Sequence, residues 1–253
     1  MNGIMNAACL REIGLSGGER ILDMGSGLGQ FSRAMARAAG PKSVVVGVER
    51  SLDQIAKARA FAQADGEESL VDFRHGDAVD LPLSPSEWSS FDVVHARFLL
   101  EHVPEPIAVV RSMVRAARPG GRIVIQDDDH DVLRVYPEPA GFTPLWNAYM
   151  RAYDRLGNDP FIGRRLVTLL HRAGAQPVRS TWIFFGACAG EAQFPGLVEN
   201  MIGVIVSARE YILQEDLIEA ASFDGAVAEL WRWSGRPDAA LWYSMCWAEG
   251  RVP

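Results

Sequence analysis

The 253-residue chain has little of several features that would assign it to a particular class of protein. It contains only three cysteines, Cys9, Cys188 and Cys246, with no CxxC pair and no metal-ligand spacing. This excludes a disulfide framework and predicts three reduced thiols that pack as small apolar residues. The cysteine usage therefore favours the cytoplasm over an oxidising compartment.

Long apolar runs and an excess of positive charge are also missing. No stretch approaches the roughly 20 apolar residues of a membrane span, and the start, MNGIMNAACLREIG, has no basic segment followed by an apolar one. The net charge is −7 and the 25 Lys and Arg residues are scattered, so no surface for a phosphate backbone is indicated. We expect a soluble protein with no membrane segment and no nucleic-acid partner.

The sequence does contain a regular alternation of short apolar runs with helical patterns. The apolar runs are rich in β-branched residues, as in strands that are covered on both faces of a parallel sheet. The segments between them carry apolar residues at helical spacing and end in glycine or proline. Repeated strand-helix units predict an α/β fold with a doubly wound, mostly parallel sheet. The predicted strands are 20–24, 43–48, 70–75, 91–96 and 122–127.

After residue 127 this alternation is interrupted by two long segments, 130–159 and 190–238. Structureless loops of this length are uncommon, so we expect both segments to be largely helical insertions that form a substrate cap or a subunit interface. A helix is expected at 160–174, and strands at 177–189 and 240–252. The remaining residues, 1–129, 160–189 and 239–253, are expected to form one core.

A glycine-rich loop follows the first predicted strand. Gly25, Gly27 and Gly29 occupy alternate positions before a helix that begins near Gln30. Glycine lets backbone N–H groups approach a ligand closely, and a helix N-terminus attracts an anionic group. Glu49 ends the second strand, where nucleotide-type ligands need a carboxylate for their ribose hydroxyls. The loop and Glu49 together predict a site for a nucleotide-type ligand.

The ordered motifs LDMGSGLG, VVGVERS, HGDAVDLPL, FDVVHARFLLEHV and RPGGRIVIQD resemble those of class I S-adenosylmethionine-dependent methyltransferases, in the branch of ubiquinone and menaquinone methyltransferases. The resemblance implies a seven-stranded Rossmann-like sheet, S-adenosylmethionine as cofactor, and methyl transfer to oxygen, carbon or nitrogen of a small, partly apolar or aromatic metabolite. The main rival is a nicotinamide-dependent oxidoreductase, but its loop reads G-x-G-x-x-G and not G-x-G-x-G. A cofactor-binding accessory or regulatory module, and a methyltransferase of macromolecules, stay open.

The resemblance also implies roles for individual residues. The three glycines would pass under the methionyl part of the cofactor, Asp23 would orient the loop and help receive the amino group, and Glu49 would hold the ribose. Residues after the second and third strands would contact the adenine, and those after the fourth strand the methionyl end. The implied cofactor-binding residues are Asp23, Gly25, Ser26, Gly27, Gly29, Glu49, Arg50, Asp77, Ala78, Ala96 and Arg97.

Candidate catalytic residues lie in QDDDHD, residues 126–131, after the fifth strand. Neighbouring side chains of a strand point to opposite faces, so the three aspartates do not all face one pocket. We predict His130 as a general base near neutral pH, with Asp128; a loop histidine satisfied by adjacent acids is an equally good interpretation. Magnesium or calcium would suit such acids, but no ligand constellation matches, and no metal is predicted. His95 is expected to be a packing residue at a strand end.

Aromatic residues are frequent in both insertions, and Tyr136, Trp146 and Tyr149 are the predicted substrate-binding residues. Packing in a core is the commoner use of such residues. A cap over the open end of the sheet would exclude water and surround an apolar substrate. The same apolar surface would serve equally as the interface of a homodimer.

Overall fold

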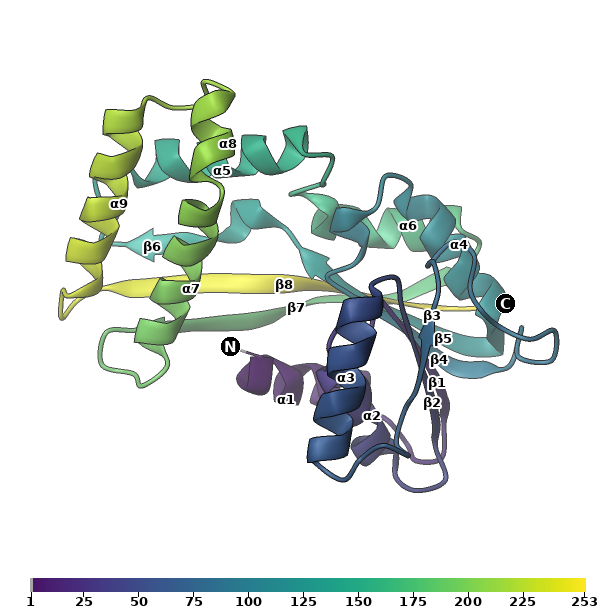
Figure 1. The fold of residues 1–253 in the computed structure, drawn as a ribbon. Coiled ribbons are helices and arrows are strands. Elements are labelled where there is room, and N and C mark those ends of the chain that lie inside the picture. Colours follow the sequence, from purple (N-terminus) through teal and green to yellow (C-terminus); the bar gives the residue numbers. More distant parts are fainter. Residues whose placement is uncertain (1) are drawn as a thin grey trace. The chain divides into compact units, whose positions relative to one another are not determined.

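The computed structural model describes residues 2–253, which form two compact units. The sheet unit comprises Asn2–Asp127, Ile162–Ile183 and Cys246–Pro253. The helical unit comprises Asp128–Phe161 and Phe184–Met245. The predicted α/β fold with a mostly parallel, doubly wound sheet is confirmed (Figure 1).

Strands and helices alternate through the sheet unit, as the apolar runs predict. Each strand is close in extent to its predicted run, except that the fifth begins earlier. The elements are α1 (Asn2–Ile13), β1 (Arg20–Met24), α2 (Gln30–Ala39), β2 (Val44–Glu49), α3 (Leu52–Ala64), β3 (Asp72–His75), β4 (Phe91–Arg97), η1 (Leu100–His102), α4 (Pro106–Ala116), β5 (Ala117–Asp128), η3 (Ile162–Arg165), α6 (Leu166–Arg172), β7 (Gln176–Cys188) and β8 (Ala240–Arg251).

The strand order is β3-β2-β1-β4-β5-β8, with β7 paired to β8, and the first five strands are parallel. The direction of the strand order reverses between β1 and β4, which is where sheets of this kind bind ligands at their carboxyl ends. Asp23 of β1 lies opposite His95 of β4, and Gln126 of β5 lies opposite Arg97, two residues further along β4. Because side chains alternate along a strand, Asp23, His95 and Gln126 point to one face of the sheet.

The other face of the sheet carries the larger apolar core of this unit. Leu22, Val46 and Val94 are almost fully buried there together with Val109 and Met113 of α4. Burying side chains of this size contributes roughly 1.5–3 kcal/mol each. Coverage by helices is the reason that the strands read as continuous apolar runs.

The helical unit has a second, separate core that includes Trp146, Phe194, Phe223 and Trp233. No helix within residues 2–253 has the length and apolar character to cross a lipid bilayer. The elements of this unit are η2 (His130–Val132), β6 (Arg134–Tyr136), α5 (Phe142–Arg155), α7 (Phe194–Ser207), α8 (Arg209–Gln214) and α9 (Ala220–Ser234).

Strand β6 was not expected from the sequence, whereas α8 lies within the segment 190–238 that was expected to be largely helical. β6 pairs antiparallel with residues 240–242 of β8, so the described residues form eight strands where the resemblance implies seven. Only Val135 of β6 is buried, between exposed Arg134 and Tyr136. A three-residue strand with one buried side chain is too short for a period-2 pattern to be detected.

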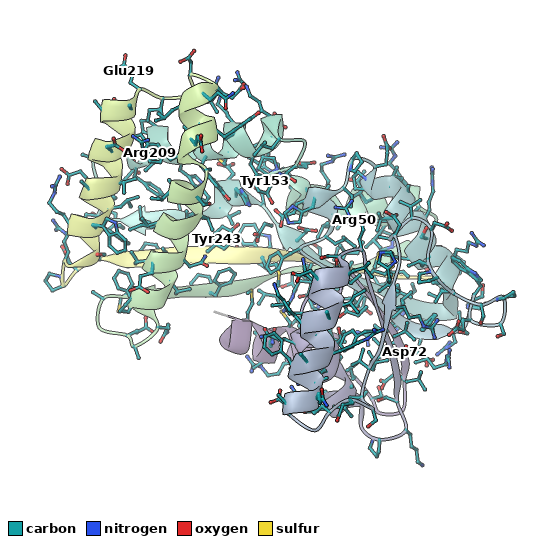
Figure 2. All side chains as sticks on the ribbon, in the orientation of Figure 1. Arg50, Asp72, Tyr153, Arg209, Glu219 and Tyr243 are labelled. Atoms are coloured by element: carbon teal, nitrogen blue, oxygen red, sulfur yellow. The ribbon has the colours of Figure 1, made fainter. Side chains whose placement is uncertain are left out.

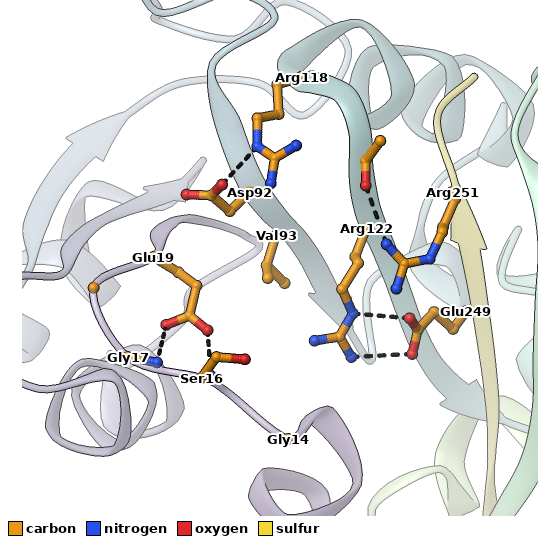
Figure 3. A pocket seen from close by; sticks show the side chains of 12 residues that line it. Gly14, Ser16, Gly17, Glu19, Asp92, Val93, Arg118, Arg122, Glu249 and Arg251 are labelled. Carbon is orange, nitrogen blue, oxygen red and sulfur yellow. Dashed lines mark hydrogen bonds and ion pairs between the residues drawn. The ribbon is translucent and has the colours of Figure 1, made fainter.

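Paired charges hold both ends of the sheet unit. At the amino ends of β4 and β5, Arg118 pairs with Asp92 at 2.6 Å and Arg122 pairs with Glu249 at 2.8 Å (Figure 3). These pairs line a cavity of about 570 Å³. Since four of its charged side chains pair with one another, and ligands of parallel sheets bind at the carboxyl ends, we do not place the functional site there.

Near the carboxyl ends, Arg74 of β3 clamps the segment that follows this strand. Its guanidinium contacts the carboxylate of Glu87 at 2.8 and 3.0 Å and the carbonyl oxygen of Pro82 at 3.2 Å. Hydrogen bonds from Arg74, together with those from the amide and hydroxyl of Ser84, lower the pKa of Glu87 to about 2. The ion pair between Arg74 and Glu87 therefore joins the two ends of the segment that carries Asp77 and Ala78.

We expect Glu87→Gln to lower the free energy of unfolding at neutral pH by about 1–2 kcal/mol, because the ion pair is lost. The pKa of Glu87 is depressed from 4.5 to about 2, so its contribution is present above pH 4.5 and disappears as the pH falls to about 2. Urea unfolding of both proteins at neutral pH and at low pH measures the difference. Glu229→Gln, which alters an exposed pair with Arg232, is the control. An equal loss at both pH values would contradict the prediction.

Candidate active site

A cavity of about 620 Å³ lies at the carboxyl ends of β1, β2 and β4 and at the loop after β3. Its walls come from the glycine loop, the start of α2, and the segments that follow β2, β3 and β4. All of the predicted cofactor residues line it except Gly29 and Ala96. The structure therefore brings together side chains and amides from four segments that are far apart in the sequence.

The glycine loop is tied to the end of β2 by backbone hydrogen bonds. The amides of Gly25 and Ser26 both donate to the carbonyl oxygen of Val48, at 2.8 and 3.0 Å. The Glu49 carboxylate accepts from the Gly27 amide at 3.0 Å and from the Ser51 amide at 2.8 Å. Glu49 is therefore held by two main-chain donors while it lines the cavity.

Gly29 is required by its surroundings as well as by its backbone. It has a φ of 71°, and a Cβ atom added to it would lie 2.3 Å from the Phe73 ring of β3. Because this distance is far below van der Waals contact, a side chain here would displace the ring or the loop. The absence of Gly29 from the cavity wall is thus explained by its role in packing α2 against β3.

Asp77 and Arg50 stand at the outer part of the cavity. The Asp77 carboxylate accepts a hydrogen bond from the Val79 amide at 2.7 Å, which is the geometry of a turn. Arg50, which is labelled in Figure 2, is exposed just before α3. Its carbonyl oxygen lies 3.1 Å from His75 Nε2. Asp77 therefore stabilises a turn in this structure. That Asp77 and Arg50 contact adenine stays a prediction.

Arg97 connects the cavity wall to the N-terminal helix. Its guanidinium lies over the Phe31 ring at 4.1 Å and donates to Asn6 Oδ1 at 2.9 Å. The neighbouring thiol of Cys9 is buried, and burial raises its pKa, so this cysteine is a packing residue. Ala96 is buried in the sheet core and does not reach the cavity.

Two residues that the sequence did not identify as functional are joined to Asp23. His95 Nδ1 lies 2.7 Å from Asp23 Oδ1, and Gln126 Nε2 lies 3.0 Å from His95 Nε2. The expectation that His95 merely packs at a strand end is therefore incomplete, because its ring makes polar contacts on both sides. The sequence signal was present in the alternation of side chains, but only the register between β1, β4 and β5 places them together.

The three aspartates at the end of β5 and directly after it make separate contacts and do not all face one pocket, as strand alternation predicts. Asp127 is fully buried, and its carboxylate accepts from the amides of Leu99 and Leu100 at 3.2 and 2.8 Å. Asp129 caps η2 by accepting from the Asp131 amide at 3.2 Å. Asp128 Oδ2 lies 3.9 Å from His130 Nε2. Of the three, Asp128 is the one that faces the predicted base.

His130 lies within an aromatic cluster of the helical unit. Its ring centroid is 5.8 Å from those of Trp146 and Tyr149 and 4.9 Å from that of Tyr153. Tyr153 is labelled in Figure 2. The Trp146 indole also donates to the His130 carbonyl oxygen at 2.8 Å. Tyr136 is 66% exposed on β6 and is not among these contacts. The structure therefore groups the predicted base His130 with two predicted substrate residues, Trp146 and Tyr149. It adds Tyr153 from one turn further along α5 and leaves Tyr136 apart.

Comparison with known proteins assigns the family. The methyltransferase domain family matches residues 15–152, which is more than half of the chain. The 27-O-demethylrifamycin SV methyltransferase of Amycolatopsis mediterranei is 35% identical over 50% of this chain and 43% of its own length. The demethylmenaquinone methyltransferase of Lactococcus lactis is 28% identical over 53% of this chain and 52% of its own. The chain spans about half the length of the curated relatives it matches.

Solved structures agree on the fold. A phosphoethanolamine N-methyltransferase 2 from Haemonchus contortus, solved with phosphomonomethylethanolamine and S-adenosylhomocysteine, has a TM-score of 0.58 and 19% identity. The similarity covers 99% of this chain and 52% of that one. At this identity the similarity establishes a shared fold.

We expect Gly29→Ala to lower the free energy of unfolding by about 2–4 kcal/mol, because the added methyl group collides with the Phe73 ring. Gly66→Ala is the matched control, since Gly66 has a φ of 67° and open space around the position of a Cβ atom. The control isolates the backbone cost, which is about 1–2 kcal/mol. Urea unfolding measures both, and an equal loss in the two variants would show that the Phe73 contact is unimportant.

Proposed function

Because this chain belongs to the class I S-adenosylmethionine-dependent methyltransferase family, we propose that it transfers a methyl group to an oxygen, carbon or nitrogen atom of a small, partly apolar or aromatic metabolite. The observation that carries the proposal is the glycine loop at the end of β1, tied to β2 by Val48 and Glu49 within the matched region. A nicotinamide-dependent oxidoreductase is not favoured by these findings.

The residues of the cavity fit a sulfonium nucleoside. Ser26 Oγ is buried in the loop and has no hydrogen-bond partner among the described residues, which suits a polar ligand. Glu49 would hold the ribose hydroxyls, Asp77 and the Ala78 amide would face the adenine, and Asp23 would receive the amino group. When bound, S-adenosylmethionine supplies a methyl group that is already activated by its positive sulfur.

The task of the protein in this proposal is alignment and exclusion of water. Holding two reactants in line lowers the activation barrier by roughly 7–11 kcal/mol. His130, with Asp128 beside it, would accept a proton from an oxygen or nitrogen nucleophile, and the aromatic cluster would surround the acceptor. Trp146 and Tyr149 support an apolar or aromatic acceptor, and Tyr136 would contact it only from an exposed position.

We also propose a cytoplasmic protein that works with small-molecule partners and forms a homodimer. The three free cysteines suit a reducing compartment. Exposed aromatic side chains of the helical unit, including Phe184, Trp231 and Trp242, offer apolar surface for a subunit interface. Size-exclusion chromatography with light scattering tests the oligomer.

Glu49→Gln should weaken binding of S-adenosylhomocysteine about 10- to 100-fold, because the carboxylate is replaced by a neutral group that holds both the loop and the ribose less well. Isothermal titration calorimetry measures the dissociation constants. Glu68→Gln, at an exposed position outside the cavity, should bind as the wild type does. No heat of binding between the wild-type protein and S-adenosylhomocysteine, or unchanged affinity of Glu49→Gln, would contradict the proposed site.

His130→Asn should lower methyl transfer by at least about 100-fold and leave affinity for S-adenosylhomocysteine unchanged, since a general base contributes roughly that much. The assay is transfer of a labelled methyl group from S-adenosylmethionine to a small-molecule extract, with exposed His171→Asn as control. Label on no acceptor would favour the accessory-module alternative. Label with undiminished activity of His130→Asn would exclude His130 as the base.

A further inference from the structure

Four buried polar side chains form a connected network beneath the glycine loop. Ser32 Oγ of α2 donates to Asp23 Oδ2 at 2.5 Å, and Asp23 Oδ1 contacts His95 Nδ1 at 2.7 Å. Gln126 Nε2 lies 3.0 Å from the far nitrogen of the same ring. The exposed fraction is 3% for Asp23 and zero for the other three residues. Burying such groups costs free energy unless they are hydrogen-bonded, and each of the four side chains has at least one partner within the network.

The direction of each hydrogen bond follows from the chemistry of the groups. A carboxylate only accepts, so Nδ1 of His95 carries the hydrogen that points to Asp23. The side-chain amide of Gln126 contacts the other ring nitrogen, Nε2. The imidazole of His95 is therefore held on both sides, by the carboxylate of Asp23 and by the amide of Gln126.

Asp23 and His95 both line the cavity, and Asp23 immediately precedes the glycine loop. The Phe31 ring packs against His95 at 5.0 Å and further limits movement of the imidazole. A partner that fixes the orientation and tautomer of a neighbouring ligand residue often matters nearly as much as that residue. Here the fixed residue is a carboxylate of the cavity.

We propose that His95 is a positioning residue, which with Ser32 and Gln126 holds Asp23 as an oriented anion for the ammonium group of the cofactor's amino-acid part. The inference rests on the proposed function and adds to it the residues that orient Asp23 toward the ammonium group. His95 orients the carboxylate of Asp23 through the contact of its Nδ1 with Asp23 Oδ1. The network thus recognises the amino-acid end of the ligand, while Glu49 and the segment after β3 recognise the nucleoside.

Two ligands separate this role from a structural one. S-adenosylhomocysteine carries the ammonium group, and methylthioadenosine has the same nucleoside and sulfur without the amino-acid part. In calorimetry, His95→Leu should bind S-adenosylhomocysteine about 10-fold or more weakly and methylthioadenosine within about 3-fold of wild type, since one charge-assisted contact is lost. Ser32→Ala should show the same selectivity with a smaller loss.

His95→Asn is the conservative variant, because an asparagine amide places a donor close to the position of Nδ1. It should restore the affinity for S-adenosylhomocysteine to within about 3-fold of wild type. His171→Leu, on an exposed face of α6, is the control histidine replacement and should change neither affinity. If His95→Leu does not fold, Ser32→Ala and His95→Asn still decide the question.

The outcomes separate the two proposals. Wild-type protein that binds neither ligand would overturn the proposed function, and the positioning role with it. Wild-type protein that binds both, with variants that lose affinity for the two ligands equally or for neither, would overturn the positioning role alone. Loss confined to S-adenosylhomocysteine, with rescue by His95→Asn, supports it.

Discussion

The hydrogen bonds between the glycine loop and the end of β2 are the constraint on which the rest of the site depends. Val48 accepts two loop amides through its carbonyl oxygen, and Glu49 accepts a third through its side chain. These contacts exist only when β1 and β2 pair in parallel with Met24 opposite Val48. The loop is therefore tied to the neighbouring strand along its length.

Two carboxylates beside this loop are held in different ways. Glu49 lies at the end of its strand, is partly exposed, and takes its hydrogen bonds from main-chain amides. Asp23 lies one residue inside its strand, is buried, and takes them from side chains of α2 and β4. An isolated buried carboxylate would cost several kcal/mol, so the partners of Asp23 are needed for folding as well as for any role in binding. A charge at this depth is possible because β4 and β5 supply a polar layer at one position of an otherwise apolar sheet.

The helical unit is built on a different principle from the sheet unit. Its core consists largely of aromatic and aliphatic side chains from α5, α7 and α9. His130 is 5% exposed among three aromatic rings, an environment in which electrostatic interactions are stronger than in water. Each unit therefore has an apolar core of its own.

The sequence by itself determined the strand-helix alternation, the position of the glycine loop and the place of Glu49, because these depend on local patterns and on the rule that parallel strands end at one edge. It also determined that Asp127, Asp128 and Asp129 do not all face one pocket, because alternation along a strand is local. It did not reveal β6, whose only buried side chain is Val135, or the partners of Asp23. His95 is 72 residues from Asp23, and only the pairing of β1 with β4 and of β4 with β5 decides that His95 and Gln126 complete one network. That pairing is a long-range property of the folded chain, since register between distant strands is set by the packing of the whole sheet and not by the residues that it brings together.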